Sequence, residues 1–152
     1  MKTTKQKFNQ LIDLAIVRIS TLSFRINETA TISNGSHNAY VHIGTQTAFD
    51  LNNNFIAIKI KVTFHPTEDT NSILMEGDFQ TIFAIKDLKN WVNPNNKNEI
   101  NLPDEVNYTM MNISLSHSRA LFANLSANGP FQHLILPILS KEWIERELLL
   151  KF

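Results

Sequence analysis

The side chains that could carry chemistry are five histidines and a few neighbouring carboxylates, in a chain of 152 residues that contains no cysteine. No two histidines have the i, i+4 spacing of a helical metal site. His37 and His42 are five residues apart, so on a strand they would point to opposite faces. His117 falls within a helical apolar pattern, where a packed core or interface histidine is expected rather than a catalyst. The histidines therefore predict neither a metal site nor a cofactor.

The carboxylates also favour structural roles. Asp104 and Glu105 open a predicted helix, where acidic side chains stabilise the positive end. Glu76 and Asp78 point to one side of a predicted strand, away from its apolar side, which is typical of a solvent face rather than a catalytic dyad. The chain has only four glycines, no glycine-rich phosphate loop, and no serine framed as a nucleophile. We therefore do not expect an enzyme.

The composition excludes several classes of partner. The 14 basic and 14 acidic side chains balance, which gives no electrostatic reason to expect nucleic acid. No run approaches the ~20 apolar residues that a membrane helix needs, and no segment resembles a signal peptide. The absence of cysteine suits a reducing compartment. We expect a cytoplasmic protein that does not insert into membranes.

Four segments have the alternating pattern of half-buried strands, which predicts an antiparallel sheet with one face in the core. In the first, Leu22, Phe24 and Ile26 stand out of phase with Val17 and Ile19, so we expect a bulge near Ser20-Thr21. The predicted strands cover residues 14–26, 39–49, 56–64 and 73–85.

The second half of the chain predicts helices. After a crossover at residues 87–103, a long helix starts at Asp104 and closes at Asn128-Gly129-Pro130. An apolar segment, Phe131–Leu139, follows, and Ser140 is a good N-cap for a last helix from Lys141 to about Leu150. We expect a flexible or short helical N-terminus at residues 1–13 and one domain at residues 14–152. The long helix has an expected apolar stripe formed by Val106, Met110, Ile113, His117, Ala120, Leu121 and Leu125.

This order of elements, together with several local sequence motifs, resembles the SecB family of export chaperones. The fourth strand carries Glu76, Gln80, Ile82, Phe83 and Ile85, similar to the Glu, Gln and Ile-Phe-x-Ile pattern of the family. The best match is the later segment with Gly129, Phe131, Leu134, Leu136, Pro137 and Ile138, which resembles Gly-x-Phe … Leu-x-Leu … Pro-Val and is one residue shorter. Arg119-Ala120 stand in the reverse of the family's Ala-Arg order, and the preceding Pro-Tyr is missing.

The resemblance implies a SecB-like α+β fold: a four-stranded antiparallel sheet with a long helix and a short C-terminal helix on one face. It also implies an ATP-independent chaperone for protein export that binds unfolded or preprotein clients and forms a homotetramer, a dimer of dimers. The resemblance gives less support to coupling to the SecA motor, which export members of the family contact through an acidic tail and an acidic sheet surface. Here the chain ends in Leu-Leu-Leu-Lys-Phe, and the third strand carries Lys59 and Lys61.

Large apolar side chains outside the regular strands are the candidate client-binding residues: Leu88, Trp91, Val92, Phe131, Leu134 and Trp143. The candidate oligomer interface lies on the long helix: Met110, Ile113, His117 and Leu121. Three alternatives stay open. They are a small-ligand-binding α+β protein or enzyme, an oligomeric adaptor, and a chaperone that guards an antitoxin outside the export pathway.

Overall fold

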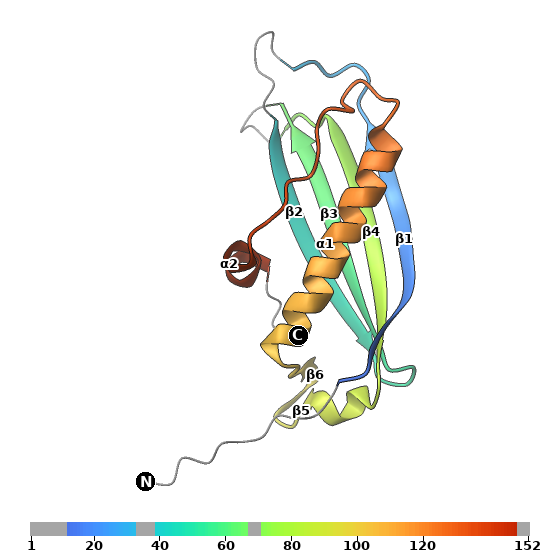
Figure 1. The fold of residues 1–152 in the computed structure, drawn as a ribbon, viewed down its shortest axis with the longest axis vertical. Coiled ribbons are helices and arrows are strands. Elements are labelled where there is room, and N and C mark those ends of the chain that lie inside the picture. Colours follow the sequence, from blue (N-terminus) through green and yellow to red (C-terminus); the bar gives the residue numbers. More distant parts are fainter. Residues whose placement is uncertain (1–11, 33–38, 67–70, 149–152) are drawn as a thin grey trace.

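One antiparallel sheet and one long helix organise the protein (Figure 1). The computed structural model describes residues 12–32, 39–66 and 71–148. The strands of the main sheet are β1 (Leu14–Ile26), β2 (Tyr40–Asp50), β3 (Phe55–His65) and β4 (Met75–Ile85), in the order β1-β4-β3-β2. They are followed by a 3₁₀ helix η1 (Leu88–Trp91), a hairpin of β5 (Val92–Asn93) and β6 (Asn96–Ile100), helix α1 (Asp104–Ser126), and the helical turns α2 (Lys141–Trp143) and η2 (Ile144–Leu148).

The sheet confirms the alternation in the sequence and the α+β class. Along β3 the even-numbered side chains Ile56, Ile58, Ile60, Val62 and Phe64 are buried. Along β4 the odd-numbered positions are buried, and β3 and β4 pair without a register shift. Of the flexible or short helical N-terminus expected at residues 1–13, residues 1–11 lie outside the described residues, and residues 12 and 13 are in neither a helix nor a strand. The part of the last helix expected beyond residue 148 also lies outside the described residues.

Strand β1 differs from its prediction. Of its two register shifts against β4, the one at Leu22 lies next to the bulge expected near Ser20-Thr21, and the one at Val17 was not predicted. Each extra residue changes which side chains face the helix. Phe24 and Ile26 face the core as expected, whereas Leu22 lies in a bulge and is exposed.

The face of α1 that packs on the sheet also differs from the prediction. The buried residues are Met110, Met111, Ser114, Leu115, Ser118, Phe122 and Ser126. Of the expected apolar stripe, Met110 belongs to this buried face, whereas Ile113, His117 and Leu121 lie only partly buried on its flank. The physical reason is that Ser114 and Ser118 donate their hydroxyls to carbonyls four residues earlier, at 2.8 Å each, so they pack as small satisfied side chains.

Phe122 anchors the helix to three strands. Its ring lies 5.3 Å from those of Phe24 and Phe64 and 6.0 Å from that of Phe79. These aromatic contacts tie α1 to β1, β3 and β4. Space for them comes from Gly77 on β4, because a Cβ there would stand 2.6 Å from Phe79 Cζ and 3.3 Å from Phe122 Cδ2.

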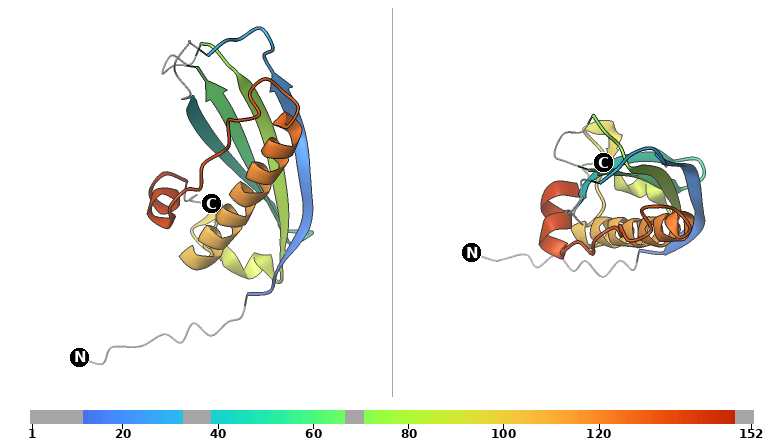
Figure 2. Two further views of the ribbon diagram at one scale, coloured as in Figure 1. Left: turned by 45° about the horizontal axis from the view of Figure 1, so that its top comes forward. Right: turned by 90° about the horizontal axis from the view of Figure 1, so that it is seen from above.

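The crossover contains a hairpin that the sequence did not predict. Asn93 and Asn96 pair across a short turn, and Asn93 Nδ2 donates to Glu99 Oε2 at 2.8 Å. Figure 2 shows α1 and the C-terminal segment on the same side of the curved sheet. No helix within the described residues is long and apolar enough to cross a membrane.

The two strand glycines give a matched test of this packing. We expect Gly77→Ala to lower the free energy of unfolding by about 1–3 kcal/mol, because the added methyl group overlaps a filled core. Gly44→Ala on β2 should change it by less than about 1 kcal/mol, since the nearest atom to its Cβ, Lys61 Cβ, lies 3.8 Å away. Urea titrations of both variants measure the difference. Equal effects would contradict the packing described.

Candidate functional site

An apolar pocket forms beside the crossover, around Trp91. It has a volume of about 570 Å³ and is lined by Ile12, Trp91, Asn101, Leu102, Pro103, Glu105 and Val106. Ile12 comes from the segment before β1, Trp91 from η1, and Val106 from the first turn of α1. One carboxylate, Glu105, is the charged group of this lining.

Backbone contacts hold Trp91 at this pocket. Asn54, in the turn between β2 and β3, has a positive φ of 58° and accepts the amide of Leu88 on Oδ1 at 3.1 Å. The same residue's carbonyl accepts the amide of Ile85. Downstream, the amide of Asn101 donates to the carbonyl of Trp91 at 2.7 Å. The start of η1 is thus bonded to the β2–β3 turn, and its end to Asn101, the residue after β6.

A second pocket lies beside the edge strand β2, around Trp143. Its volume is about 710 Å³. The lining combines Val41, His42, Ile43 and Gly44 of β2, Lys61 and Thr63 of β3, and Leu139 and Trp143 of the C-terminal segment. Val41, Ile43, Leu139 and Trp143 also pack partly buried against the core, so the apolar wall is continuous with it.

Polar contacts hold the C-terminal segment in place. The side chain of Arg119 on α1 donates to the carbonyls of Leu136, at 3.0 Å, and Pro137, at 2.9 Å. Ser140 caps the last helical segment, as predicted, by accepting the amide of Trp143. The ammonium of Lys141 lies 5.1 Å from the ring centre of Tyr108, a cation–π contact with α1.

The predicted client-binding residues separate into two groups. Trp91 and Trp143 line pockets, but two different ones, and Val92 is partly buried in the hairpin. Leu88, Phe131 and Leu134 are in the core, with at most 6% of their surface exposed. The sequence analysis missed Ile12, Val41, Ile43, Leu139 and Val106. Val41, Ile43 and Val106 follow strand or helix spacing, and Ile12 and Leu139 lie in segments with no regular pattern. Only the fold brings each of them to the wall of a pocket.

The predicted interface residues adjoin the edge strand β1. His117 Nδ1 lies 3.2 Å from the Thr81 hydroxyl of β4, and Thr81 pairs with Ile19 of β1. Burial lowers the pKa of His117, because desolvation disfavours the charged imidazolium. Ile113 and Leu121 are partly buried on the same flank, whereas Met110 is wholly buried in the core.

Strand β1 itself exposes an apolar row. Ile16, Val17, Ile19 and Leu22 are each between 43% and 49% exposed. Ile16 and Ile19 pair with Phe83 and Thr81, so they stand on the helix side of the sheet, next to the flank of α1. We call these residues, together with the flank of α1, the β1–α1 patch: Ile16, Val17, Ile19, Leu22, Ile113, His117 and Leu121.

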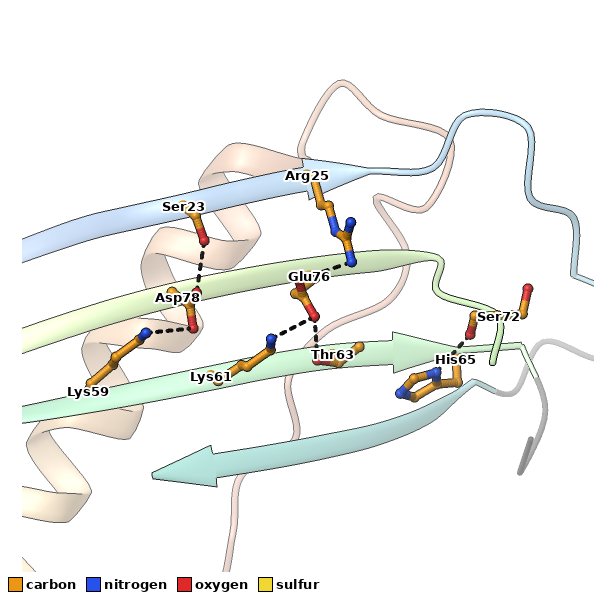
Figure 3. A network of polar contacts seen from close by, with 9 residues as sticks. All are labelled: Ser23, Arg25, Lys59, Lys61, Thr63, His65, Ser72, Glu76 and Asp78. Atoms are coloured by element: carbon orange, nitrogen blue, oxygen red, sulfur yellow. Dashed lines mark hydrogen bonds and ion pairs between the residues drawn. The ribbon is translucent and has the colours of Figure 1, made fainter. Parts of the chain in front are cut away.

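The opposite face of the sheet carries an ion-pair network (Figure 3). Glu76 lies 3.2 Å from Arg25 and 3.0 Å from Lys61, and Asp78 lies 3.6 Å from Lys59 and accepts from the Ser23 hydroxyl. Both carboxylates are at most 17% exposed, while the cations flank them at 34–64%. These acids act in surface ion pairs. Within the described residues, no three His, Asp or Glu groups come close enough together to hold a metal ion.

Comparison with known proteins relates the fold to a chaperone. No family model matches the sequence, and no curated protein matches it. A SecB-like chaperone of Mycobacterium tuberculosis, solved in complex with a ChAD peptide from the HigA1 antitoxin, superposes with a TM-score of 0.58 at 13% identity, covering 84% of this chain and 90% of that one. A protein of unknown function from Streptococcus agalactiae gives 0.39 at 14% identity, covering 86% and 98%. At these identities the comparison shows that the fold is SecB-like.

Proposed function

We propose that this protein is an ATP-independent chaperone that holds unfolded polypeptides in the two tryptophan pockets. The observation that carries the proposal is the pair of open, mostly apolar pockets, each with one partly buried tryptophan on a well-anchored segment. An unfolded chain exposes apolar side chains at irregular intervals. Separate apolar pockets can bind these side chains without reading a sequence, because hydrophobic burial is non-directional.

The chaperone seen in the structural comparison supports this reading, since it shares the fold and was solved with a peptide of a partner protein. The principal alternative, a small-ligand-binding protein or enzyme, expects several polar groups that converge in one pocket. The polar side chains of the Trp91 lining are Asn101 and Glu105, and those of the Trp143 lining are His42, Lys61 and Thr63. Of the latter, Lys61 pairs with Glu76 and the Thr63 hydroxyl donates to the same carboxylate, which lies outside the pocket lining. The chaperone reading therefore fits these linings better.

The proposal does not extend to the export motor. The family resemblance associates that contact with an acidic sheet surface. Here the carboxylates of Glu76 and Asp78 are largely buried, and the cations that pair with them, Arg25, Lys59 and Lys61, are more exposed (Figure 3). A role outside export, such as protecting one partner protein from aggregation, agrees better with this charge arrangement.

Suppression of aggregation tests the proposal. The wild type should suppress aggregation of a chemically denatured model protein at near-stoichiometric ratio, equally with and without nucleotide. Trp91→Ala and Trp143→Ala should each weaken client affinity roughly thirtyfold, about 2 kcal/mol, because a large aromatic loses its buried contact area. Their melting temperatures should stay near that of the wild type, since both side chains are only partly buried.

Ile138→Ala is the matched control, because this side chain is apolar and 85% exposed but lines neither pocket. It should leave suppression unchanged. A wild type that suppresses the aggregation of no denatured protein would overturn the proposal. Equal loss in all three variants would show that any exposed apolar side chain serves, which contradicts pocket binding.

We further propose that two copies associate through the β1–α1 patch. A contiguous apolar surface of this kind on a soluble domain typically marks an interface. A two-fold arrangement would bring each patch against its counterpart, as self-complementary interfaces do. The partly buried His117 would lose its remaining water there, and this further burial acts in the same direction as the desolvation that already lowers its pKa.

Light scattering tests this association at micromolar concentration. The wild type should be a dimer or a dimer of dimers, and Ile19→Glu should shift it toward monomer by placing a charge in the interface. Ile135→Glu, at a side chain that is 63% exposed on the C-terminal segment, should not. A monomeric wild type, or equal dissociation in both variants, would refute the proposed interface.

A further inference from the structure

Two histidine side chains from neighbouring strands lie together on the face of the sheet that carries the ion pairs. His42 of β2 pairs in register with Thr63 of β3, and His65 of β3 pairs with Tyr40, so the histidines are diagonal neighbours on one face. Their ring centres are 5.0 Å apart, with the ring planes at 60°. Sequence spacing does not reveal this pair, because its members belong to different strands.

A backbone carbonyl fixes the tautomer of His65. Its Nδ1 lies 2.7 Å from the carbonyl oxygen of Ser72, and because a carbonyl oxygen can only accept, Nδ1 carries the proton. In the neutral ring the lone pair is therefore on Nε2, which Figure 3 shows on the side of the ring away from Ser72. Metal-binding histidines have this arrangement, since they usually donate their other ring N–H to a carbonyl or a carboxylate.

The separation of the two rings suits one shared metal ion. With a Zn–N bond of about 2.0–2.1 Å, each ring centre would lie about 3.2 Å from the ion, and two rings on a tetrahedral ion would have centres about 5.2 Å apart. The observed separation of 5.0 Å is close to this value. His65 is only 4% exposed, so its ring is held in place, whereas His42 is exposed and its ring can turn toward an ion.

The ligand type decides which cations fit. Neutral imidazole suits zinc, copper and nickel, whereas magnesium and calcium prefer oxygen ligands. Nearby on the same face, the carboxylate of Glu76 accepts from Thr63 and pairs with Arg25 and Lys61. These three charged groups sum to one positive charge, so general electrostatic attraction does not favour a cation there. The affinity has to come from the imidazole nitrogens, and this predicts selectivity for transition metals.

We propose that His42 and His65 form a two-histidine site for a divalent transition-metal ion such as Zn²⁺. No third His, Asp or Glu of the described residues joins them, so water would complete the coordination. The ion would connect the edge strand β2 to the end of β3. Because it binds the folded arrangement, it would also stabilise the folded chain. The site does not depend on the proposed chaperone function.

Calorimetric titration with zinc chloride tests the site. The wild type should bind one Zn²⁺ per chain, and magnesium chloride should give no binding. His42→Ala should weaken zinc binding at least about tenfold, since even the loss of an outer partner of a metal ligand typically costs 10–100-fold. His133→Ala is the matched control, because it removes an exposed histidine that lies on the segment after α1. It should bind zinc as the wild type does.

A second variant addresses the buried ligand. His65→Gln keeps a side-chain N–H that can donate to the Ser72 carbonyl but has no imidazole lone pair, so it should fold and lose zinc binding. Zinc should raise the melting temperature of the wild type and of His133→Ala, and leave those of His42→Ala and His65→Gln unchanged. These melting curves distinguish a lost ligand from a lost fold.

Long-range ¹H–¹⁵N NMR spectra of the histidine rings identify the ligand atoms. Without metal, His65 should show the Nδ1–H tautomer. Zinc should shift Nε2 of His65 and one ring nitrogen of His42 together, and leave His133 unshifted. Equal zinc affinity in the wild type and His42→Ala, or unchanged His65 signals, would overturn the proposal. Half an ion per chain with a doubled mass would place the ion between two copies, which contradicts a site within one chain.

Discussion

One helix cannot cover a four-stranded sheet, and this constraint shapes the whole molecule. The outer strands of such a sheet stand about 14 Å apart, three spacings of about 4.8 Å, whereas a helix with its side chains is about 10 Å wide. Helix α1 crosses β4, β3 and part of β1 and is anchored there through Phe122. Apolar side chains on both flanks of the helix therefore need other cover.

The two flanks of helix α1 are covered differently. On the β2 side, the segment after α1 returns along the sheet and is fixed by the two hydrogen bonds from Arg119. This cover is partial, and the Trp143 pocket is what it leaves open. On the β1 side no segment of the described residues returns, and Ile16 and Ile19 are exposed there, Ile19 opposite the Thr81 that contacts His117. In the proposed account, clients occupy the first flank and a second copy covers the other.

The fold was largely predictable because apolar and polar residues alternate clearly along the strands. Ile56, Ile58 and Ile60 identified a sheet face, and Ser140 identified a helix start. The orientation of α1 was not predictable from hydropathy. Ser114 and Ser118 count as polar, yet with their hydroxyls bonded to the helix backbone they are small packing residues. The β5–β6 hairpin was missed because its Asn-rich sequence has no alternation and is held by side-chain contacts such as Asn93 to Glu99.

The sequence predicted which types of residue form the candidate site, but not which of these residues lie together. Trp91 and Trp143 were identified because large aromatics outside strands are good contact residues, but only the structure places them in two separate pockets. Phe131 and Leu134 have the same apolar character and lie in the core. Whether an apolar side chain is covered depends on segments that are distant in the sequence. For example, a hydrogen bond from Arg119 to the carbonyl of Leu136 holds the C-terminal segment on α1. The local hydropathy pattern contains no information about such contacts.

The most direct test of the central account uses the two tryptophans as reporters. The chain contains only two, so its amide-correlated NMR spectrum has two indole N–H signals. Titration with a permanently unfolded polypeptide should shift or broaden both signals, without nucleotide, because each indole lines a separate pocket. If the unfolded polypeptide leaves both signals unchanged at concentrations where a chaperone should be saturated, neither pocket binds clients and the account is contradicted.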